Sequence, residues 1–216
     1  MLEKMAEFFD SRLDDYEEHM LDCIESAREF YPFTAQQLPK TPGALVLDLG
    51  CGTGLELDEY YVLNPEAEVT GIDLAPGMLN TLRNKFPDKL LTLIQGSYFD
   101  VPFGENMFVA AVSVESLHHF TQEEKIPLYR KLCQALKPDG YFILTDYFAP
   151  TEEEEKLYRA ELLRLKAEQG IADDEFYHYD TPLTVEHETQ ALLNAGFSKV
   201  QMLEQWDATV TLRAEK

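Results

Sequence analysis

The sequence predicts an α/β fold built on a doubly wound, mostly parallel β-sheet. Between residues 44 and 145, short apolar runs alternate with segments of helical period, which is the pattern of repeated strand–helix units. The apolar runs are nearly unbroken, as expected for parallel strands covered by helices on both faces. A chain of 216 residues is enough for one hydrophobic core and short for two, so we expect a single domain with right-handed crossovers.

Five apolar runs are expected to form the parallel strands, at 44–49, 68–73, 90–95, 108–114 and 141–145. Helices should connect them over 55–63, 76–86 and 121–137. Pro76 stands at a first helical position, and Thr121 with Glu124 forms a capping box. Pro127 predicts a kink or a late start of the third helix. Pro138-Asp139-Gly140 predicts a turn before the fifth strand.

The segment before this core is expected to cover it. Over residues 1–30, apolar side chains recur at spacings of three and four, which predicts one amphipathic helix. Pro32, Pro39 and Pro42 then predict turns. We therefore divide the first part of the chain into an N-terminal helical cap, 1–40, and a ligand-binding core, 41–146.

The segments after the core divide in the same way. Residues 147–183 interrupt the alternation with an acidic helix between Thr151 and Gly170 and an aromatic-rich stretch over 173–180, which together predict a lid insertion. Residues 184–216 begin with a helix that ends at Ala195-Gly196. Two alternating runs follow, and they predict an antiparallel hairpin that closes the edge of the sheet, at 199–205 and 209–213.

The charge of the chain excludes several kinds of partner. Forty acidic residues stand against eighteen basic ones, for a net charge of −22. Such a surface repels nucleic-acid phosphates and anionic lipid headgroups, and no apolar run approaches the ~20 residues of a membrane span. The acidic N-terminus lacks a signal-peptide pattern. The three cysteines, Cys23, Cys51 and Cys133, are few and widely spaced, which predicts reduced thiols. We expect a cytoplasmic protein with neither nucleic-acid nor membrane partners.

The most specific signal is a glycine-rich turn after the first strand, Asp48-Leu49-Gly50-Cys51-Gly52-Thr53-Gly54. Its glycines permit a tight turn and close approach of a ligand. Gly71-Ile72-Asp73 ends the next strand, where a carboxylate accepts hydrogen bonds from both hydroxyls of a ribose. Together they predict a nucleoside-bearing ligand at the C-terminal edge of the sheet. The alternatives are a purely structural turn and an NAD site, although NAD sites use G-x-G-x-x-G.

These motifs resemble the class I S-adenosylmethionine-dependent methyltransferases. The glycine-rich turn is similar to their first motif, and Gly71-Ile72-Asp73 to their second. Leu117-His118-His119-Phe120 and Leu136-Lys137-Pro138-Asp139-Gly140 are similar to later segments, so the resemblance covers about 40–213. It implies a Rossmann-like sheet of seven strands with an antiparallel last strand. It also implies S-adenosyl-L-methionine as cofactor and S-adenosyl-L-homocysteine as product.

The resemblance further implies roles for the residues of the first motif. Gly50, Cys51 and Gly52 would line the methionine moiety with backbone atoms. Gly54 would allow close packing. Asp48 would organise the loop around the ammonium group of the ligand, directly or through water.

Other residues would hold the adenosine part. Asp73 would bind the ribose diol and Leu74 would pack on the adenine. Met78 would cover the same region, unless it serves only in core packing. The loop Gly96-Ser97-Tyr98 would approach the adenine amino group, where many members have Asp in place of Ser97. A serine still forms a hydrogen bond there, but as a neutral partner.

Methyl transfer from a sulfonium is an in-line displacement, which requires positioning of the nucleophile about 3–3.5 Å from the methyl carbon. A hydroxyl or ammonium acceptor also requires a base. Glu115 and His118 are the candidate catalytic residues, because they follow the fourth strand, and Glu115 would also contact the cofactor. His119 is a weaker candidate, and one of the two histidines is expected to be structural. No metal is required, and no cluster with metal-ligand spacing is apparent.

Three observations bear on the acceptor. Val114-Glu115-Ser116-Leu117 stands where DNA amino-methyltransferases carry Asn/Asp-Pro-Pro-aromatic, which argues against a nucleic-acid base. The segments 1–40 and 147–183 each hold ten acidic and four basic residues, and both are rich in aromatics. Aromatic groups beside carboxylates favour a cationic or amine substrate, unless these acids are simply solvated. We therefore predict methyl transfer to a small molecule. The alternatives are an aminopropyltransferase-like enzyme of the same fold and a non-catalytic protein that binds S-adenosylmethionine.

Overall fold

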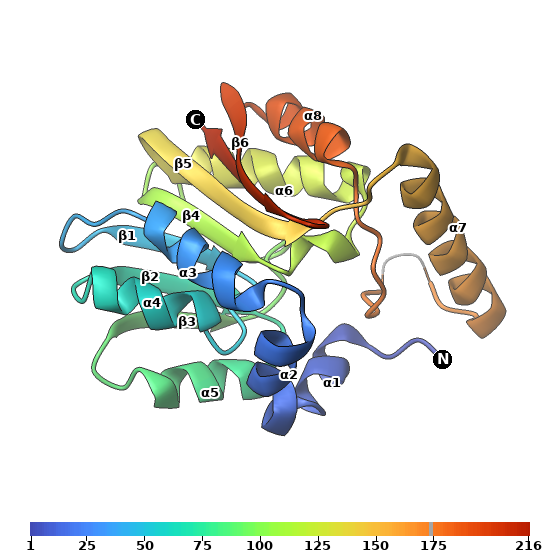
Figure 1. Ribbon diagram of the computed structural model, residues 1–216, viewed down its shortest axis with the longest axis horizontal. Helices are drawn as coiled ribbons and strands as arrows, with labels where there is room; N and C mark the ends of the chain where they lie inside the picture. The colour runs from blue at the N-terminus through green and yellow to red at the C-terminus, as the bar shows by residue number, and fades with distance from the viewer. Residues whose placement is uncertain (173–174) are drawn as a thin grey trace.

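A seven-stranded sheet forms the centre of the protein, in the order β3-β2-β1-β4-β5-β7-β6 (Figure 1). The computed structural model describes residues 1–172 and 175–216. Its strands are β1 (Leu45–Leu49), β2 (Glu68–Asp73), β3 (Leu90–Gln95), β4 (Phe108–Val114), β5 (Leu136–Tyr147), β6 (Lys199–Trp206) and β7 (Thr209–Glu215). β1 to β5 pair in parallel, whereas β7 runs antiparallel to both β5 and β6. The predicted mostly parallel sheet with a reversed last strand is confirmed.

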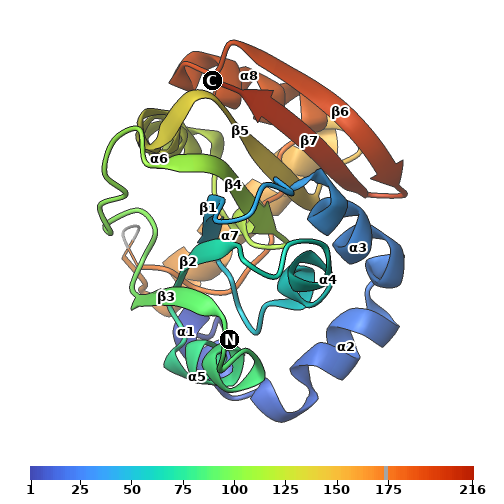
Figure 2. The ribbon, with the colours of Figure 1, turned by 90° about the vertical axis from the view of Figure 1, so that its left-hand side faces the viewer.

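Helices cover both faces of the sheet (Figure 2). One face packs against α3 (Ala27–Gln37), α4 (Leu55–Leu63) and α5 (Pro76–Lys85). The other packs against α6 (Gln122–Ala135) and α8 (Val185–Ala195). Neighbouring side chains of β1 alternate between these two cores, with Val46 in the first and Leu47 in the second. Because both faces of the central strands are covered, their sequences are apolar throughout.

A buried ion pair joins α6 to α8 inside the second core. The Lys125 Nζ atom lies 2.5 Å from Glu188 Oε2, and the two side chains are 2% and 1% exposed. The hydroxyl of Tyr129 donates a second hydrogen bond to Glu188. The pair is costly to break, because removal of one partner leaves the other charge buried without compensation.

The N-terminal segment differs from the single helix predicted over 1–30. It forms α1 (Met5–Asp10), the 3-10 turn η1 (Leu13–Asp15) and α2 (Tyr16–Cys23), and a left-handed Ser26 precedes α3. Tertiary contacts explain the breaks. Asp10 accepts a hydrogen bond from the N–H of Gly77 at the start of α5, at 2.9 Å, and each short helix contacts a different part of the rim of the core.

Proline positions account for three further differences. Pro32 lies inside α3 and does not break it, because the helix buries Phe30 and Tyr31 and loses only one backbone hydrogen bond. α6 begins at Gln122 with the predicted capping box, so the late start considered for Pro127 does not occur. Pro138, Asp139 and Gly140 lie within β5, not in a turn before it, at an irregularity opposite Phe108.

The predicted insertion pairs with the N-terminal segment. Its helix α7 (Glu152–Gln169) begins after the cap Thr151 and ends at Gly170, as predicted, and lies at one end of the molecule (Figure 1). Lys4 and Tyr177 form a β-bridge, flanked by a hydrogen bond from the N–H of His178 to the carbonyl of Glu3. Of the predicted aromatic-rich stretch, Asp173 and Asp174 lie outside the described residues.

None of the helices within 1–172 and 175–216 combines the length and the apolar character needed to cross a membrane.

Candidate cofactor and acceptor site

The glycine-rich turn connects the C-terminal end of β1 to α4. Gly50 and Gly54 have φ angles of +74° and +75°, a region that favours glycine. A Cβ atom at Gly50 would lie 2.0 Å from Ser116 Oγ, and one at Gly54 would lie 2.5 Å from Leu82 Cδ1. The close-packing role predicted for Gly54 is thereby explained: it lets α4 start directly against α5.

Asp73 holds this turn from the end of β2. Its Oδ2 accepts a hydrogen bond from the N–H of Gly52 at 2.9 Å, and its Oδ1 accepts one from the N–H of Ala75 at 2.8 Å. Burial raises the pKa of Asp73, and these hydrogen bonds oppose the shift. Each carboxylate oxygen has two lone pairs, so both can also accept a hydroxyl hydrogen.

A small cavity of about 50 Å³, the cofactor cavity, lies in front of this turn. Of the predicted binding residues, it is lined by Gly50, Gly52, Asp73, Leu74, Met78, Tyr98 and Glu115. Cys51, Gly54, Gly96 and Ser97 do not line it; the Ser97 hydroxyl instead accepts the N–H of Phe99 at 3.2 Å. Met5, Phe9 and Tyr16 of the N-terminal segment form its opposite wall. The space is enough for only a few water molecules, so a nucleoside can enter only if this wall shifts.

Asp48 lies behind the turn in β1, together with Glu56 of α4. Both side chains are buried, and among the described residues no hydrogen-bond partner reaches Asp48 Oδ2 or Glu56 Oε1. Burial, followed by the charge of Glu56, raises the pKa of Asp48 well above its usual value. Asp48 does not line the cofactor cavity, so its role toward an ammonium group stays a prediction.

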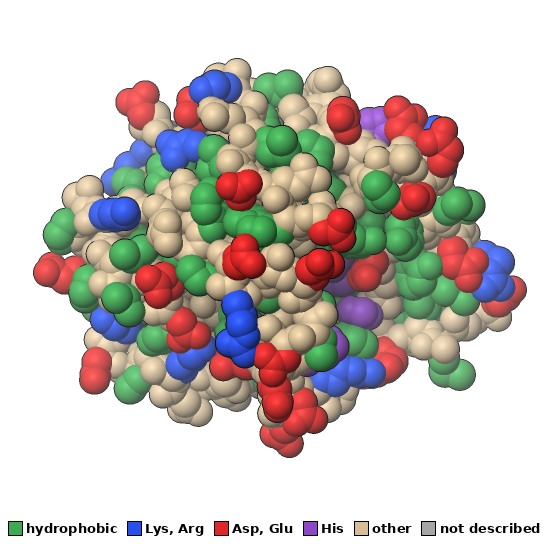
Figure 3. Space-filling view, in the orientation of Figure 1, with side chains coloured by type: hydrophobic (Ala, Val, Ile, Leu, Met, Phe, Trp, Pro, Cys, Tyr) green, Lys and Arg blue, Asp and Glu red, His purple; other side chains and the backbone are tan. Residues whose placement is uncertain are grey.

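A second, larger space of about 790 Å³, the acceptor cavity, adjoins the first. The two share Phe9, Tyr16, Glu115 and His119. Its walls come from the N-terminal helices, the segment after β4, the end of β5, residues near 178–180 and the β6–β7 turn. Figure 3 shows histidine side chains in the hollow between the N-terminal helices and α7.

Glu115 stands at the junction of the two cavities. It has a φ of +48°, which is rare for a residue other than glycine and typical of a constrained functional position. Its N–H donates to the carbonyl of Thr145 at 2.9 Å, and its Oε1 accepts the hydroxyl of Thr209 at 3.3 Å. Burial, followed by the charge of Asp146, raises the pKa of Glu115 to about 8.

His118 is held by Asp146 at the end of β5. The distance from His118 Nδ1 to Asp146 Oδ1 is 2.6 Å, and Asp146 Oδ2 accepts the N–H of Leu117 at 2.8 Å. Burial would lower the pKa of His118, but Asp146 and Asp180 raise it well above its usual value. Burial, followed by the charge of His118, lowers the pKa of His119 to about 4.

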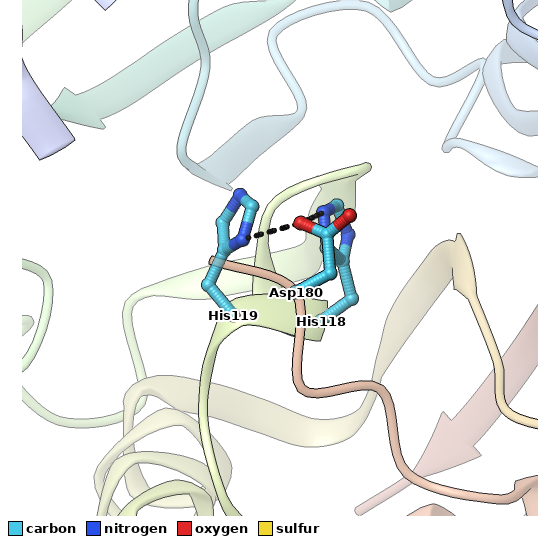
Figure 4. A group of neighbouring side chains, drawn as sticks. All are labelled: His118, His119 and Asp180. Atoms are coloured by element: carbon cyan, nitrogen blue, oxygen red, sulfur yellow. Dashed lines mark ion pairs between the residues drawn. The ribbon is translucent and has the colours of Figure 1, made fainter. Parts of the chain in front are cut away.

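The sequence shows no histidine–carboxylate cluster with metal-ligand spacing, but the fold brings such a group of side chains together. His118, His119 and Asp180 come together on the wall of the acceptor cavity (Figure 4). Sequence reasoning missed Asp180 as a site residue because about sixty positions separate it from the histidines. It also missed Asp146, although a polar residue at the C-terminal end of β5 should face the same crevice as Asp73.

Comparison with known proteins agrees with this geometry. A methyltransferase domain family matches residues 46–140. An uncharacterized methyltransferase from Synechocystis is 32% identical over 128 residues, which are 59% of this chain and 58% of that protein. These matches support a class I S-adenosylmethionine-dependent methyltransferase domain over residues 46–140, which hold the glycine-rich turn and Asp73. S-adenosylmethionine is the cofactor of such methyltransferases, and the cofactor cavity is lined by Asp73 and by Gly50 and Gly52 of the glycine-rich turn.

Two further comparisons extend the range of relatives. The tRNA (carboxymethyluridine(34)-5-O)-methyltransferase of Arabidopsis thaliana is 28% identical over 125 residues, 57% of this chain and 29% of that protein. An S-adenosylmethionine-dependent methyltransferase from Mesorhizobium loti shares the fold, with a TM-score of 0.62 and 22% identity over 86% of this chain and 96% of that one. The chain thus spans little more than half of the length of the first relative and less than a third of the second.

Proposed function

We propose that the protein transfers the methyl group of S-adenosylmethionine to a small molecule bound in the acceptor cavity, by in-line displacement. The observation that carries this proposal is the junction of the two cavities at Glu115 and His119. A cofactor in the smaller cavity and an acceptor in the larger one would meet there. A volume of about 790 Å³ lies in the range of small-molecule sites.

Glu115 is the proposed base for an acceptor that must lose a proton. Among the described residues, its carboxylate is the one that lines both cavities, whereas Asp73 lines the cofactor cavity alone. The hydroxyl of Thr209 and the constrained backbone of Glu115 hold the carboxylate in position. His118 is the second candidate. Its Nδ1 is engaged by Asp146 and its pKa is raised, so it can act as a base only through Nε2 and only after that nitrogen has lost its proton.

The charge around the acceptor cavity supports the further proposal of a cationic or amine acceptor. Four carboxylates line it besides Glu115, whose pKa is raised, against the single guanidinium of Arg12 among the described lining residues: Asp15, Glu25, Asp180 and Asp207. Tyr16, Tyr147 and Trp206 add aromatic faces, which attract cations.

A tRNA acceptor is the alternative, because several relatives are named as tRNA methyltransferases. The net charge of −22 opposes it, since binding of a polyanion relies on lysine and arginine contacts to phosphates. An aminopropyltransferase-like activity and a purely ligand-binding role are further alternatives.

The test is a methylation assay with methyl-labelled S-adenosylmethionine and two acceptor pools, a fractionated metabolite extract and total tRNA. We expect label in a small molecule and none in tRNA. Glu115→Gln should lower kcat by roughly 10²- to 10⁴-fold, whereas Glu204→Gln on the exposed edge strand β6 should not. Label in tRNA alone would contradict the proposed acceptor. Tighter binding of decarboxylated S-adenosylmethionine in calorimetry would favour aminopropyl transfer.

A further inference from the structure

Two histidines and one aspartate point toward a common centre on the wall of the acceptor cavity (Figure 4). His118 and His119 belong to the 3-10 turn η2 (Leu117–His119), and Asp180 lies in the segment before α8. His118 Nε2 lies 3.5 Å from Asp180 Oδ1, and His119 Nδ1 lies 3.2 Å from the same oxygen. The two histidine side chains are 10% and 3% exposed, whereas that of Asp180 is 45% exposed.

These separations match those of ligands around a tetrahedral metal ion. With metal–ligand bonds of about 2.0–2.1 Å, neighbouring ligand atoms of a tetrahedron stand about 3.3–3.4 Å apart. The distance of 3.5 Å is long for a hydrogen bond, and the distance of 3.2 Å is at the upper end of the usual range. His119 Nδ1 also lies 3.3 Å from the carbonyl oxygen of Tyr179, a contact that metal binding would replace.

Asp146 supplies the outer contact that metal-binding histidines usually have. It accepts a hydrogen bond from His118 Nδ1 at 2.6 Å, so Nε2 is the nitrogen directed toward Asp180, and it would release its proton when a metal binds. The N–H of Leu117 fixes the other oxygen of Asp146 at 2.8 Å. The orientation and tautomer of His118 are therefore set by groups buried behind it.

A different set of ligands, Glu115, His118 and Asp146, fits less well. The 2.6 Å between His118 Nδ1 and Asp146 Oδ1 is shorter than any adjacent ligand pair on one ion, and is that of a hydrogen bond. Glu115 Oε2 lies 4.0 Å from the same nitrogen, which requires nearly opposite positions on the ion. The first set is free of both conflicts.

Charge favours a cation at this place. Three carboxylates surround the two histidine rings, from Glu115, Asp146 and Asp180. Arg12 is the single lysine or arginine among the described residues that line the cavity. A dication would offset the excess of negative charge. Imidazole nitrogens with one carboxylate suit zinc and its transition-metal neighbours rather than calcium or magnesium.

We propose that His118, His119 and Asp180 bind one divalent transition-metal ion of the zinc class on the wall of the acceptor cavity. Three protein ligands leave a fourth coordination position on the ion, as in catalytic zinc sites. This position would face the acceptor cavity, because all three ligands line that cavity and Asp180 is partly exposed. If the proposed methyl transfer holds, an oxygen or nitrogen atom of the acceptor would occupy that position. The binding of the metal itself does not depend on that activity.

The test uses the full chain, freed of metal by chelation and dialysis, with Zn²⁺ in titration calorimetry and Co²⁺ in visible absorption. We expect one ion per chain and the intense absorption of four-coordinate cobalt. His118→Asn and Asp180→Asn should each weaken Zn²⁺ binding by about 100-fold or more, and Asp146→Asn by about 10- to 100-fold. His187→Asn is the matched control, because His187 pairs with Glu155 outside the cavity.

Circular dichroism and S-adenosylhomocysteine binding identify any variant that has lost its fold, and Asp180→Asn changes a side chain that is 45% exposed. Absence of stoichiometric Zn²⁺ and Co²⁺ binding would overturn the proposal. Equal affinity of the Asp180→Asn variant and the unmodified protein would overturn it too. A protein that binds Zn²⁺ as expected but methylates no small molecule would retain this site and refute the proposed acceptor instead.

Discussion

Replacement of Asp73 by alanine tests the assignment of the cofactor cavity most directly. The carboxylate holds the glycine turn through the N–H groups of Gly52 and Ala75 at 2.9 and 2.8 Å, and lines the cavity with its remaining acceptor capacity. Loss of the two hydrogen bonds expected with the ribose should weaken S-adenosylhomocysteine binding by roughly 1.5–3 kcal/mol. This corresponds to about a 10- to 150-fold increase in Kd.

The same substitution has a second, separable cost. It leaves two backbone N–H groups without their acceptor, and each unsatisfied donor costs roughly 1–3 kcal/mol when water does not replace the acceptor. We therefore expect the free energy of unfolding to fall by about 2–6 kcal/mol. Asp88→Ala, at an exposed position before β3, should change neither quantity.

Titration calorimetry with S-adenosylhomocysteine and urea denaturation measure the two effects independently. A variant that loses stability but binds with unchanged Kd would show that Asp73 only supports the turn. A variant that retains both stability and affinity would refute the whole assignment of this carboxylate.

Four further outcomes are expected. Gly50→Ala should destabilise the protein by at least about 2 kcal/mol in urea denaturation, because its Cβ would lie 2.0 Å from a serine hydroxyl at a φ of +74°. Lys125→Met should cost about 3–5 kcal/mol by the same measurement, because it leaves the other charge of the α6–α8 pair buried; an unchanged melting curve would contradict this. The pKa of Asp48 is raised in the folded state, so the carboxyl group loses its proton at lower pH in the unfolded chain than in the folded protein. The contribution of Asp48 to the free energy of unfolding therefore declines as pH rises above about 4. Asp48→Asn should therefore melt at a higher temperature than the unmodified protein at pH 8, and the difference should shrink at pH 5. Hydrogen exchange over residues 1–24 and 175–180 should slow when S-adenosylhomocysteine is added, because the first segment walls the cofactor cavity and pairs with the second; exchange that does not respond would exclude a lid.

Local patterns in the sequence were sufficient for most of the sheet. The strand β4 and the helices α4 and α7 were predicted at or within one residue of their observed ends, because their apolar runs, caps and terminal glycine express local preferences. In the first 30 residues the helical period of the apolar side chains was recognised, but the single helix predicted from it was wrong, because the segment forms several short helices. Their breaks depend on contacts such as that of Asp10 with Gly77, between positions 67 residues apart.

The order of β6 and β7 shows the same limit. The alternating runs predicted a hairpin, but only the pairing of β7 with β5 places the last strand inside the sheet and β6 at the edge. Hydrogen bonds between distant strands leave no periodic signal in either strand.

The sequence by itself determined the places of the glycine-rich turn and Asp73, which stand at the ends of two adjacent parallel strands. Close backbone approach and ribose recognition need those residue types at those places. Only the tertiary structure decided which groups face the turn and Asp73 across the two cavities. The N-terminal wall of the cofactor cavity, the Asp146 contact to His118, and the meeting of both histidines with Asp180 join segments from separate parts of the chain. Such groups become neighbours only through packing around a common core, and that packing is encoded by the whole chain and not by the spacing of any one motif.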